Sequence, residues 1–135
     1  MKRTFVDAGV LIAAVRGQEE LARRALKVLS DPEREFIGSP FLRLEVLPKA
    51  IHHRRLSEVR FYREFFETVR HWPLDVESVV AEAFTVGVEL GLSALDALHV
   101  AVAANLGCEE LITTEQPNKP IYRSRSVKVV YLMAS

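Results

Sequence analysis

The chain has 135 residues, 49% of them hydrophobic and 27% charged, which excludes a disordered or fibrous protein and is typical of one soluble globular domain. Its 18 basic and 18 acidic residues cancel, so the net charge does not indicate nucleic-acid binding. The single cysteine, Cys108, excludes an internal disulfide framework and a multi-cysteine zinc site. With neither a signal peptide nor a membrane-length apolar run, we expect one cytoplasmic domain, residues 1–135, without membrane contact.

Strands and helices alternate along the sequence. Hydrophobic patterning predicts strands over residues 2–6, 35–38, 110–113 and 127–132, and helices over residues 8–16, 19–29, 40–54, 56–68, 76–90 and 93–106. Residues 116–126, rich in proline, serine and basic side chains, are predicted to form one long loop. Because helices separate the strands, we expect a three-layer α/β/α fold with a central, mostly parallel sheet flanked by helices.

Two acidic residues lie just past the ends of predicted strands. Asp7 comes after the first strand and Glu115 after the strand that ends at Thr113. Ligands of an open parallel sheet bind beyond the carboxyl ends of the strands, so the two carboxylates converge if these strands are neighbours. Two simpler interpretations remain open: Asp7 caps the following helix, and Glu115 is a solvated loop residue.

Glu45 is predicted to lie on the apolar face of its helix, between Phe41 and Leu42. A carboxylate in apolar surroundings is costly unless it is paired or bound to a cation. Lys49, four residues further on, could form an ordinary helical ion pair with it. Glu45 is therefore either half of that pair or a ligand.

Asp96 is the only charged residue between Gly91 and Gly107. Together with Ser93 it matches a capping box, which would explain it without any further role. His99 lies one helical turn later. It either orients a carboxylate or water, or is a hydrogen-bonded histidine at the edge of the core.

The four acids together indicate a particular chemistry. Clustered carboxylates repel one another and need bound cations or altered protonation at neutral pH. All-oxygen ligation favours Mg²⁺ or Mn²⁺ over zinc, and such ions promote in-line hydrolysis of phosphodiesters. We therefore take Asp7, Glu45, Asp96 and Glu115 as the candidate catalytic and metal-binding residues.

With these residues, the chain resembles the PIN-domain family of nucleases, which includes the toxins of VapBC toxin–antitoxin systems. The resemblance covers nearly the whole length and rests on four segments: Phe5-Val6-Asp7, residues 39–46 around Glu45, residues 96–101 from Asp96 to Ala101, and residues 111–115 ending in Glu115. It implies a parallel sheet flanked by helices and cleavage of RNA with Mg²⁺ or Mn²⁺. It also implies that Asp7, Glu45 and Asp96 are metal-binding acids, with Glu115 in place of a usual aspartate.

The resemblance further implies three kinds of partner: RNA, a cognate antitoxin and a second copy of the chain. Basic side chains at residues 52–55 and beyond Lys119 could hold an RNA backbone, although solvated faces explain them too. The aromatic helix over residues 56–68 could provide a dimer or antitoxin surface unless it packs in the core.

The chain departs from the family pattern after the first aspartate, where small hydroxyl or amide residues are usual and Ala8 and Gly9 stand instead. Thr113 and Thr114 are candidates for compensating oxygens. The leading hypothesis is a cytoplasmic, metal-dependent ribonuclease, the toxin of a toxin–antitoxin pair. The alternative is a catalytically weak or inactive PIN-like module that binds RNA or a protein partner. A third alternative is a receiver-like or phosphatase-like domain with Asp7 as covalent phosphate acceptor, and Gly9, which stands where a second acid belongs, argues against the phosphatase version.

Overall fold

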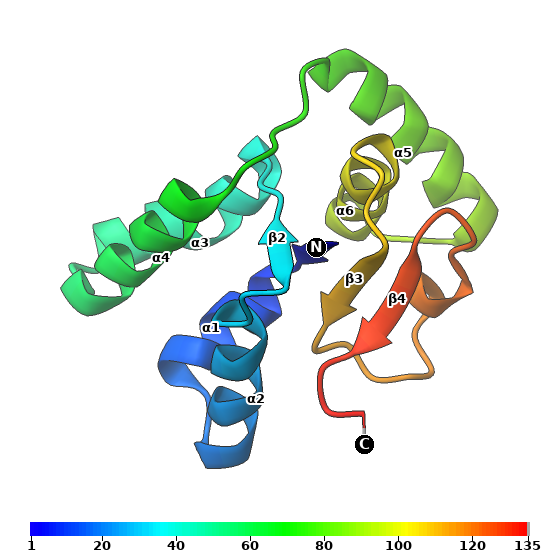
Figure 1. Ribbon diagram of the computed structural model, residues 1–135. Coiled ribbons are helices and arrows are strands. Elements are labelled where there is room, and N and C mark those ends of the chain that lie inside the picture. Colours follow the sequence, from blue (N-terminus) through cyan, green and yellow to red (C-terminus); the bar gives the residue numbers. More distant parts are fainter. Residues whose placement is uncertain (135) are drawn as a thin grey trace.

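The computed structural model describes residues 1–134 and contains four strands, six α-helices and one short 3₁₀-helix (Figure 1). In chain order these are β1 (Lys2–Val6), α1 (Ala8–Arg16), α2 (Glu19–Leu29), β2 (Arg34–Phe36), α3 (Pro40–His52), α4 (Leu56–Thr68), α5 (Val76–Leu90), α6 (Ala94–Asn105), β3 (Glu110–Thr113), the 3₁₀-helix η1 (Pro120–Arg123) and β4 (Lys128–Tyr131).

The sheet has the order β2-β1-β3-β4, and every neighbouring pair of strands is parallel. The two central strands align Phe5 with Leu111 and Val6 with Ile112, and all four of these side chains are buried. Their near-continuous apolar sequence is what a strand covered on both faces requires. The predicted α/β/α architecture with a central parallel sheet is confirmed.

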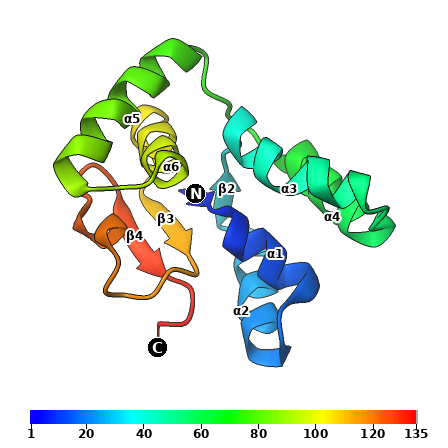
Figure 2. The ribbon, with the colours of Figure 1, turned by 180° about the vertical axis from the view of Figure 1, so that it is seen from behind.

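Helices cover both faces of this sheet. The chain moves from β1 to β2 in one direction and from β2 across to β3 and β4 in the other. Right-handed crossovers therefore place α1 and α2 on one face and α5 and α6 on the other. Figures 1 and 2 show α1–α2 and α5–α6 as separate pairs, with the α3–α4 pair extending from the β2 edge. Glu45 lies on α3 and Asp96 on α6, two elements that contact each other.

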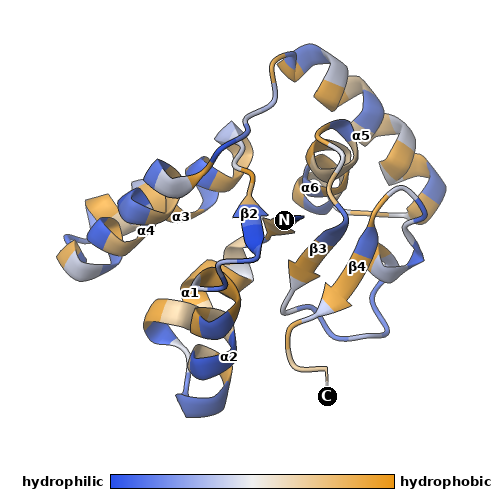
Figure 3. Ribbon diagram, viewed as in Figure 1, coloured by the Kyte–Doolittle hydropathy of each residue, from blue (hydrophilic) through white to orange (hydrophobic). Residues whose placement is uncertain are grey.

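The hydrophobic core lies between the sheet and the helices. In Figure 3 most of β3 and β4 is hydrophobic, whereas the helices alternate between hydrophobic and hydrophilic residues. Helix α6 is mostly buried from Ala97 to Ala103, and Cys108 just after it is buried as well. Burial raises the pKa of the Cys108 thiol to about 12, so this cysteine acts as a packing residue.

The aromatic helix α4 mainly contributes to the core. Val59, Tyr62 and Phe65 are buried, and the Phe65 ring packs edge-on against Phe36 of β2. The sequence left open whether this helix offers a partner surface. Its aromatic side chains pack largely inside the protein.

A few boundaries differ from those predicted from the sequence. Helix α3 ends at His52 rather than at residue 54, because Arg54 adopts a left-handed backbone conformation with φ of 54°. Strand β2 stops at Phe36, since Ile37 forms only an isolated bridge to His71. The predicted loop after Glu115 contains the helical turn η1.

No single helix among residues 1–134 is long and apolar enough to cross a membrane; α5 and α6 pass that test only as a pair bent by 117°.

Candidate active site

Asp7 stands at the carboxyl end of β1, one of the two central strands. Its backbone N–H donates to the carbonyl of Ile112 at 3.1 Å, so the residue still belongs to the ladder between β1 and β3. One carboxylate oxygen, Oδ1, accepts the backbone N–H of Val10 at 3.2 Å and caps helix α1. The other oxygen, Oδ2, accepts the hydroxyl of Thr113 at 2.5 Å. Capping and site membership, which the sequence presented as alternatives, are compatible at Asp7.

Thr113 and Tyr122 fix the chain around Glu115. The Thr113 hydroxyl accepts the backbone N–H of Glu115 at 3.0 Å, and the Tyr122 hydroxyl donates to the carbonyl of Glu115 at 2.6 Å. The Glu115 side chain is half-buried and forms no hydrogen bond or ion pair with another of the described residues 1–134. Its main chain is therefore anchored while its carboxylate is uncommitted. Nothing in the sequence pattern pointed to Tyr122.

The surroundings of Asp7 disfavour its negative charge. Burial raises its pKa from 3.8 to about 6, more than the Thr113 hydrogen bond and the His99 charge lower it, and the charge of Glu45 raises it slightly further. Burial also raises the pKa of the Tyr122 hydroxyl to about 12, with further increases from Tyr131, Asp7 and Glu115. This edge of the sheet thus concentrates negative charge where solvation is poor.

Glu45 pairs with His99 and not with Lys49. The Nε2 atom of His99 on α6 is hydrogen-bonded to Oε1 of Glu45 on α3, 54 positions away in the sequence. The exposed Lys49 forms no ion pair in the described part of the chain. The helical ion pair considered from the sequence is therefore absent there, and Glu45 faces α6 instead.

Asp96 lies in the first turn of α6 and is half-buried. The hydroxyl of Ser93 makes no capping hydrogen bond, so the capping box is not formed. Because α6 leads into β3 through a short turn, its first turn lies toward the carboxyl end of the sheet, as Asp7 does. No hydrogen bond or ion pair within residues 1–134 engages the carboxylate of Asp96.

The four candidate acids do not form a compact metal site in this structure. Nowhere within residues 1–134 do three or more Asp, Glu, His or Cys side chains lie close enough to hold a metal ion. The chemistry of the donors nevertheless fits a hard divalent cation, because Asp7 and Glu45 offer carboxylate oxygens. The raised pKa of Asp7 also shows an under-compensated negative charge that a cation would stabilise.

Gly9 closely approaches Thr114. A Cβ at position 9 would lie 2.1 Å from the Thr114 hydroxyl and 3.2 Å from Oδ1 of Asp7. The space that a side chain at position 9 would fill is thus occupied by a hydroxyl from the end of β3. Thr114 therefore places a hydroxyl oxygen near Asp7, where Ala8 and Gly9 provide none.

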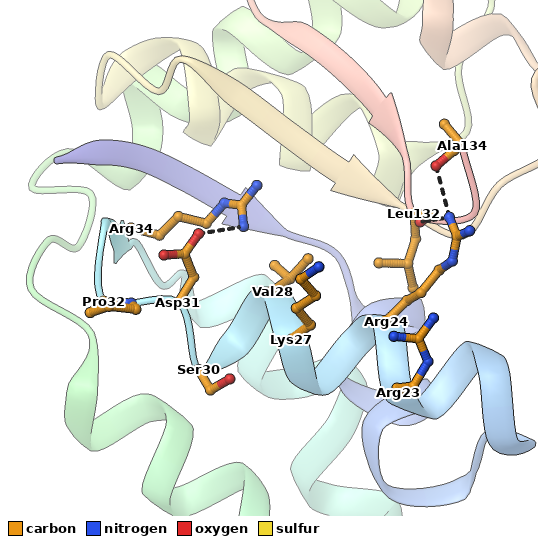
Figure 4. Close-up of a pocket in the computed structure, with 10 residues that line it drawn as sticks. All are labelled: Arg23, Arg24, Lys27, Val28, Ser30, Asp31, Pro32, Arg34, Leu132 and Ala134. Atoms are coloured by element: carbon orange, nitrogen blue, oxygen red, sulfur yellow. Dashed lines mark hydrogen bonds and ion pairs between the residues drawn. The ribbon is translucent and has the colours of Figure 1, made fainter.

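A separate hollow of about 700 Å³ lies beside helix α2 (Figure 4). It is lined by Arg23, Arg24, Lys27 and Arg34, which would suit phosphate. Most of that charge is committed: Arg24 bonds Glu20 and the carbonyl of Ala134, and Arg34 bonds Asp31 and buried Glu110. We therefore assign these arginines to the stability of the fold.

A family model for the PIN domain matches residues 4–116, so the chain belongs to the PIN-domain family. PIN domains are generally nucleases that use divalent metal ions. The PIN fold thus accounts for the central parallel sheet with helices on both faces.

Solved structures share this fold. VapBC2 from Rickettsia felis, bound to a DNA fragment from its promoter, is 11% identical over 96% of this chain and 98% of that chain, with a TM-score of 0.72. VapBC-1 from nontypeable Haemophilus influenzae is 14% identical over 98% of this chain and 99% of that chain, with a TM-score of 0.69. FitAcB from Neisseria gonorrhoeae is 20% identical over 96% of this chain and 97% of that chain, with a TM-score of 0.60. A search of curated proteins by sequence found no match.

Proposed function

We propose that the protein is a metal-dependent endoribonuclease that hydrolyses RNA phosphodiester bonds with Mg²⁺ or Mn²⁺. The observation that carries this proposal is the environment of Asp7 in a PIN domain. Its carboxylate stands at the end of a central strand, held by Thr113 and within electrostatic range of Glu45 and His99, and its pKa is raised to about 6. Such a charge is costly without a counter-ion.

In this proposal Asp7 and Glu45 hold the metal, and Asp96 and Glu115 supply the remaining carboxylates. A divalent cation held by these carboxylates would offset phosphate charge and make water more acidic. Thr113 keeps Oδ2 of Asp7 in place, and the anchored main chain of Glu115 limits where its carboxylate can reach. Asp96 stands in the first turn of α6, where the helix dipole favours negative charge.

The segment after Glu115 supports binding of an RNA backbone. It carries Lys119, Arg123 and Arg125, all exposed and none of them in an ion pair with a residue of the described chain, whereas Lys128, the next basic residue, aligns with Glu110 at the amino end of the sheet. Tyr122 ties this segment to Glu115 through its 2.6 Å hydrogen bond. Contacts of these cations to phosphates would make RNA affinity fall steeply with added salt.

We further propose that the protein is the toxin of a type II toxin–antitoxin pair in the cytoplasm, with a cognate antitoxin as partner and homodimer formation. VapBC2 and VapBC-1, whose fold it shares, motivate this proposal. Apolar side chains exposed along α5, among them Phe84 at 77% and Val88 at 72%, are typical of a protein with a partner surface. A small antitoxin-like reading frame adjoining the gene would support it, and its absence would count against it.

The test of the enzymatic proposal is cleavage of RNA by purified protein with added Mn²⁺, comparing wild type with Asp96→Asn. We expect cleavage by the wild type that chelation of the metal abolishes, and a loss of cleavage in the variant because it lacks one carboxylate of the metal site. Equal cleavage by the two proteins would remove Asp96 from the catalytic assignment.

A second function has one observation in its favour. Asp96 and Glu115 are not gathered with Asp7 and Glu45 into a ready metal site within residues 1–134, as a weak or inactive PIN-like binding module would allow. Metal titration separates the two: a nuclease site predicts that Mn²⁺ raises the melting temperature by mass action, and that Glu45→Gln lowers this rise. RNA binding without any response to Mn²⁺ would favour the module.

A further inference from the structure

His99 is a buried polar residue that forms a specific hydrogen bond in addition to packing contacts. Its side chain is 3% exposed, and its ring lies against Phe5 of β1 with ring centroids 5.1 Å apart. The ring is therefore packed in the interface that its own helix, α6, makes with β1. Any group bonded to it is held in a fixed place relative to Asp7, two residues beyond Phe5.

The two ring nitrogens of His99 are used differently. Nε2 is hydrogen-bonded to Oε1 of Glu45, whereas Nδ1 is buried and has no partner among residues 1–134. A neutral ring with its proton on Nε2 donates to the carboxylate and leaves only a lone pair unsatisfied at Nδ1, and a protonated ring donates from Nε2 as well. The alternative tautomer would leave a buried N–H without an acceptor, which costs more. The geometry therefore assigns the donor role to Nε2.

From these contacts we propose that His99 is a positioning residue: its Nε2–H holds Oε1 of Glu45, so that Oε2 is directed to the divalent cation. The inference rests on the proposed function, because it concerns how that site receives its metal. Asp96, one turn before His99 on the same helix, is another of the site's acids. One helix thus carries a candidate ligand and the residue that orients a second one.

The physical benefit is preorganisation. A free glutamate side chain loses most of its rotamer freedom when it is fixed, and this loss opposes binding. Glu45 is 24% exposed and lies on a helix that extends from the edge of the sheet, so without a partner it would sample several rotamers. The hydrogen bond from His99 fixes the Glu45 side chain when the protein folds. Metal binding then does not have to offset the loss of its rotamer freedom. Partners that orient metal ligands typically change metal affinity by about 10–100-fold when they are removed.

Simple packing does not explain this arrangement as well. A leucine or phenylalanine at position 99 would fill the space between α6 and Phe5 without an unpaired nitrogen. Lys49, the helical partner available to Glu45 on its own helix, is not used. A purely structural histidine would therefore predict that apolar replacement leaves metal affinity unchanged.

The experiment measures Mn²⁺ affinity by calorimetry for the wild type and for three substitutions, His99→Gln, His99→Asn and His99→Leu. Glutamine places an amide N–H near the position of Nε2, whereas the shorter asparagine reaches only the position of Nδ1. We expect Mn²⁺ to bind about 10-fold or more weakly to the asparagine and leucine variants, and within about 3-fold of wild type to the glutamine variant. The exposed residue His52 on the outside of α3 provides the matched control, His52→Leu, which should leave affinity unchanged.

Repeating the substitutions in Glu45→Gln protein tests whether His99 acts through Glu45. We expect His99→Leu to change Mn²⁺ affinity less than about 2-fold in that background, because coupled residues are not additive. Equal affinity of wild type and His99→Leu, or an undiminished loss in the Glu45→Gln background, would overturn the inference alone. Wild-type protein that binds no Mn²⁺ would overturn the proposed function and this inference with it.

Discussion

The hydroxyl of Thr113 on β3 bridges two parts of the candidate site, because it donates to Oδ2 of Asp7 at 2.5 Å and accepts the backbone N–H of Glu115 at 3.0 Å. One small side chain thus fixes the acid at the end of β1 and the chain that carries the acid after β3. This relationship exists because β1 and β3 are adjacent and parallel, with Val6 aligned to Ile112.

Thr113→Val removes this hydroxyl while preserving shape. We expect the pKa of Asp7 to rise further, since the Thr113 hydrogen bond lowers it in the native protein. The variant should lose about 1.5–3 kcal/mol of unfolding free energy at pH 8, because a charged acceptor and a backbone donor lose their partner. Urea unfolding in the presence of a chelator measures the loss. Thr113→Ser, which keeps the hydroxyl, should stay within about 1 kcal/mol of wild type.

The raised pKa of Asp7 predicts a pH-dependent stability in metal-free protein. Its folded-state pKa is about 6 against an ordinary value of 3.8, so the folded protein binds this proton more tightly than the unfolded chain. The resulting stabilisation is complete below pH 3.8 and is lost as the pH rises through 6.

Asp7→Asn removes this titration and keeps the helix cap, since asparagine caps as well as aspartate. Relative to wild type, we expect its unfolding free energy to improve by about 2–3 kcal/mol between pH 4 and pH 8, in line with two pKa units. Denaturant titrations at both pH values provide the comparison. A stability difference that does not change with pH would show that Asp7 has an ordinary pKa.

Gly9 makes a prediction whose sign depends on Thr114. On an open helix, replacing glycine with alanine stabilises by about 0.5–1 kcal/mol. Here the new Cβ would meet the Thr114 hydroxyl at 2.1 Å, so we expect Gly9→Ala to destabilise by about 1–3 kcal/mol. In a Thr114→Ala background the same change should become neutral or stabilising. Thermal unfolding of the four proteins tests this, and an equal effect of Gly9→Ala in both backgrounds would refute the close approach.

Glu110 and Arg34 form a buried anchor at the opposite, amino end of the sheet. Glu110 is 5% exposed and accepts the Thr4 hydroxyl at 2.7 Å and Nε of Arg34 at 2.9 Å. Arg34→Met should therefore cost about 3 kcal/mol of unfolding free energy, because it leaves a buried carboxylate short of its partner. Combining it with Glu110→Gln should recover part of that loss. Mn²⁺ affinity should not change in either protein, and a large change would show that this anchor and the site are coupled.

Much of the fold could be predicted from the sequence, because hydrophobic periodicity and chain-breaking residues are local signals. The apolar runs ending at Val6 and Thr113 mark the central strands, and the Ser39 hydroxyl caps α3 by accepting the backbone N–H of Leu42 at 3.0 Å. The end of α3 was less predictable, since the left-handed conformation of Arg54 has no signature in side-chain pattern.

The candidate site was only partly visible in the sequence. Asp7 stood out because a strand ended there, but the partner of Glu45 did not, since His99 lies on another helix and local spacing offered only Lys49. The contact of Gly9 with Thr114 and the hydrogen bond of Tyr122 to Glu115 likewise join distant segments. Periodicity gives the face on which a residue lies, whereas tertiary packing decides which residue it meets.

The most direct test of the account is RNA cleavage by wild type and Asp7→Asn in Mn²⁺, with analysis of the product ends. Asp7→Asn is the sharpest comparison because it should fold as stably as wild type at neutral pH or better, so lost cleavage cannot be attributed to unfolding. We predict cleavage by the wild type only, with water as the attacking group and therefore no 2′,3′-cyclic phosphate on the products. Equal cleavage by both proteins, cyclic phosphate ends, or no cleavage by the wild type at any Mn²⁺ concentration would contradict the proposed metal-dependent ribonuclease.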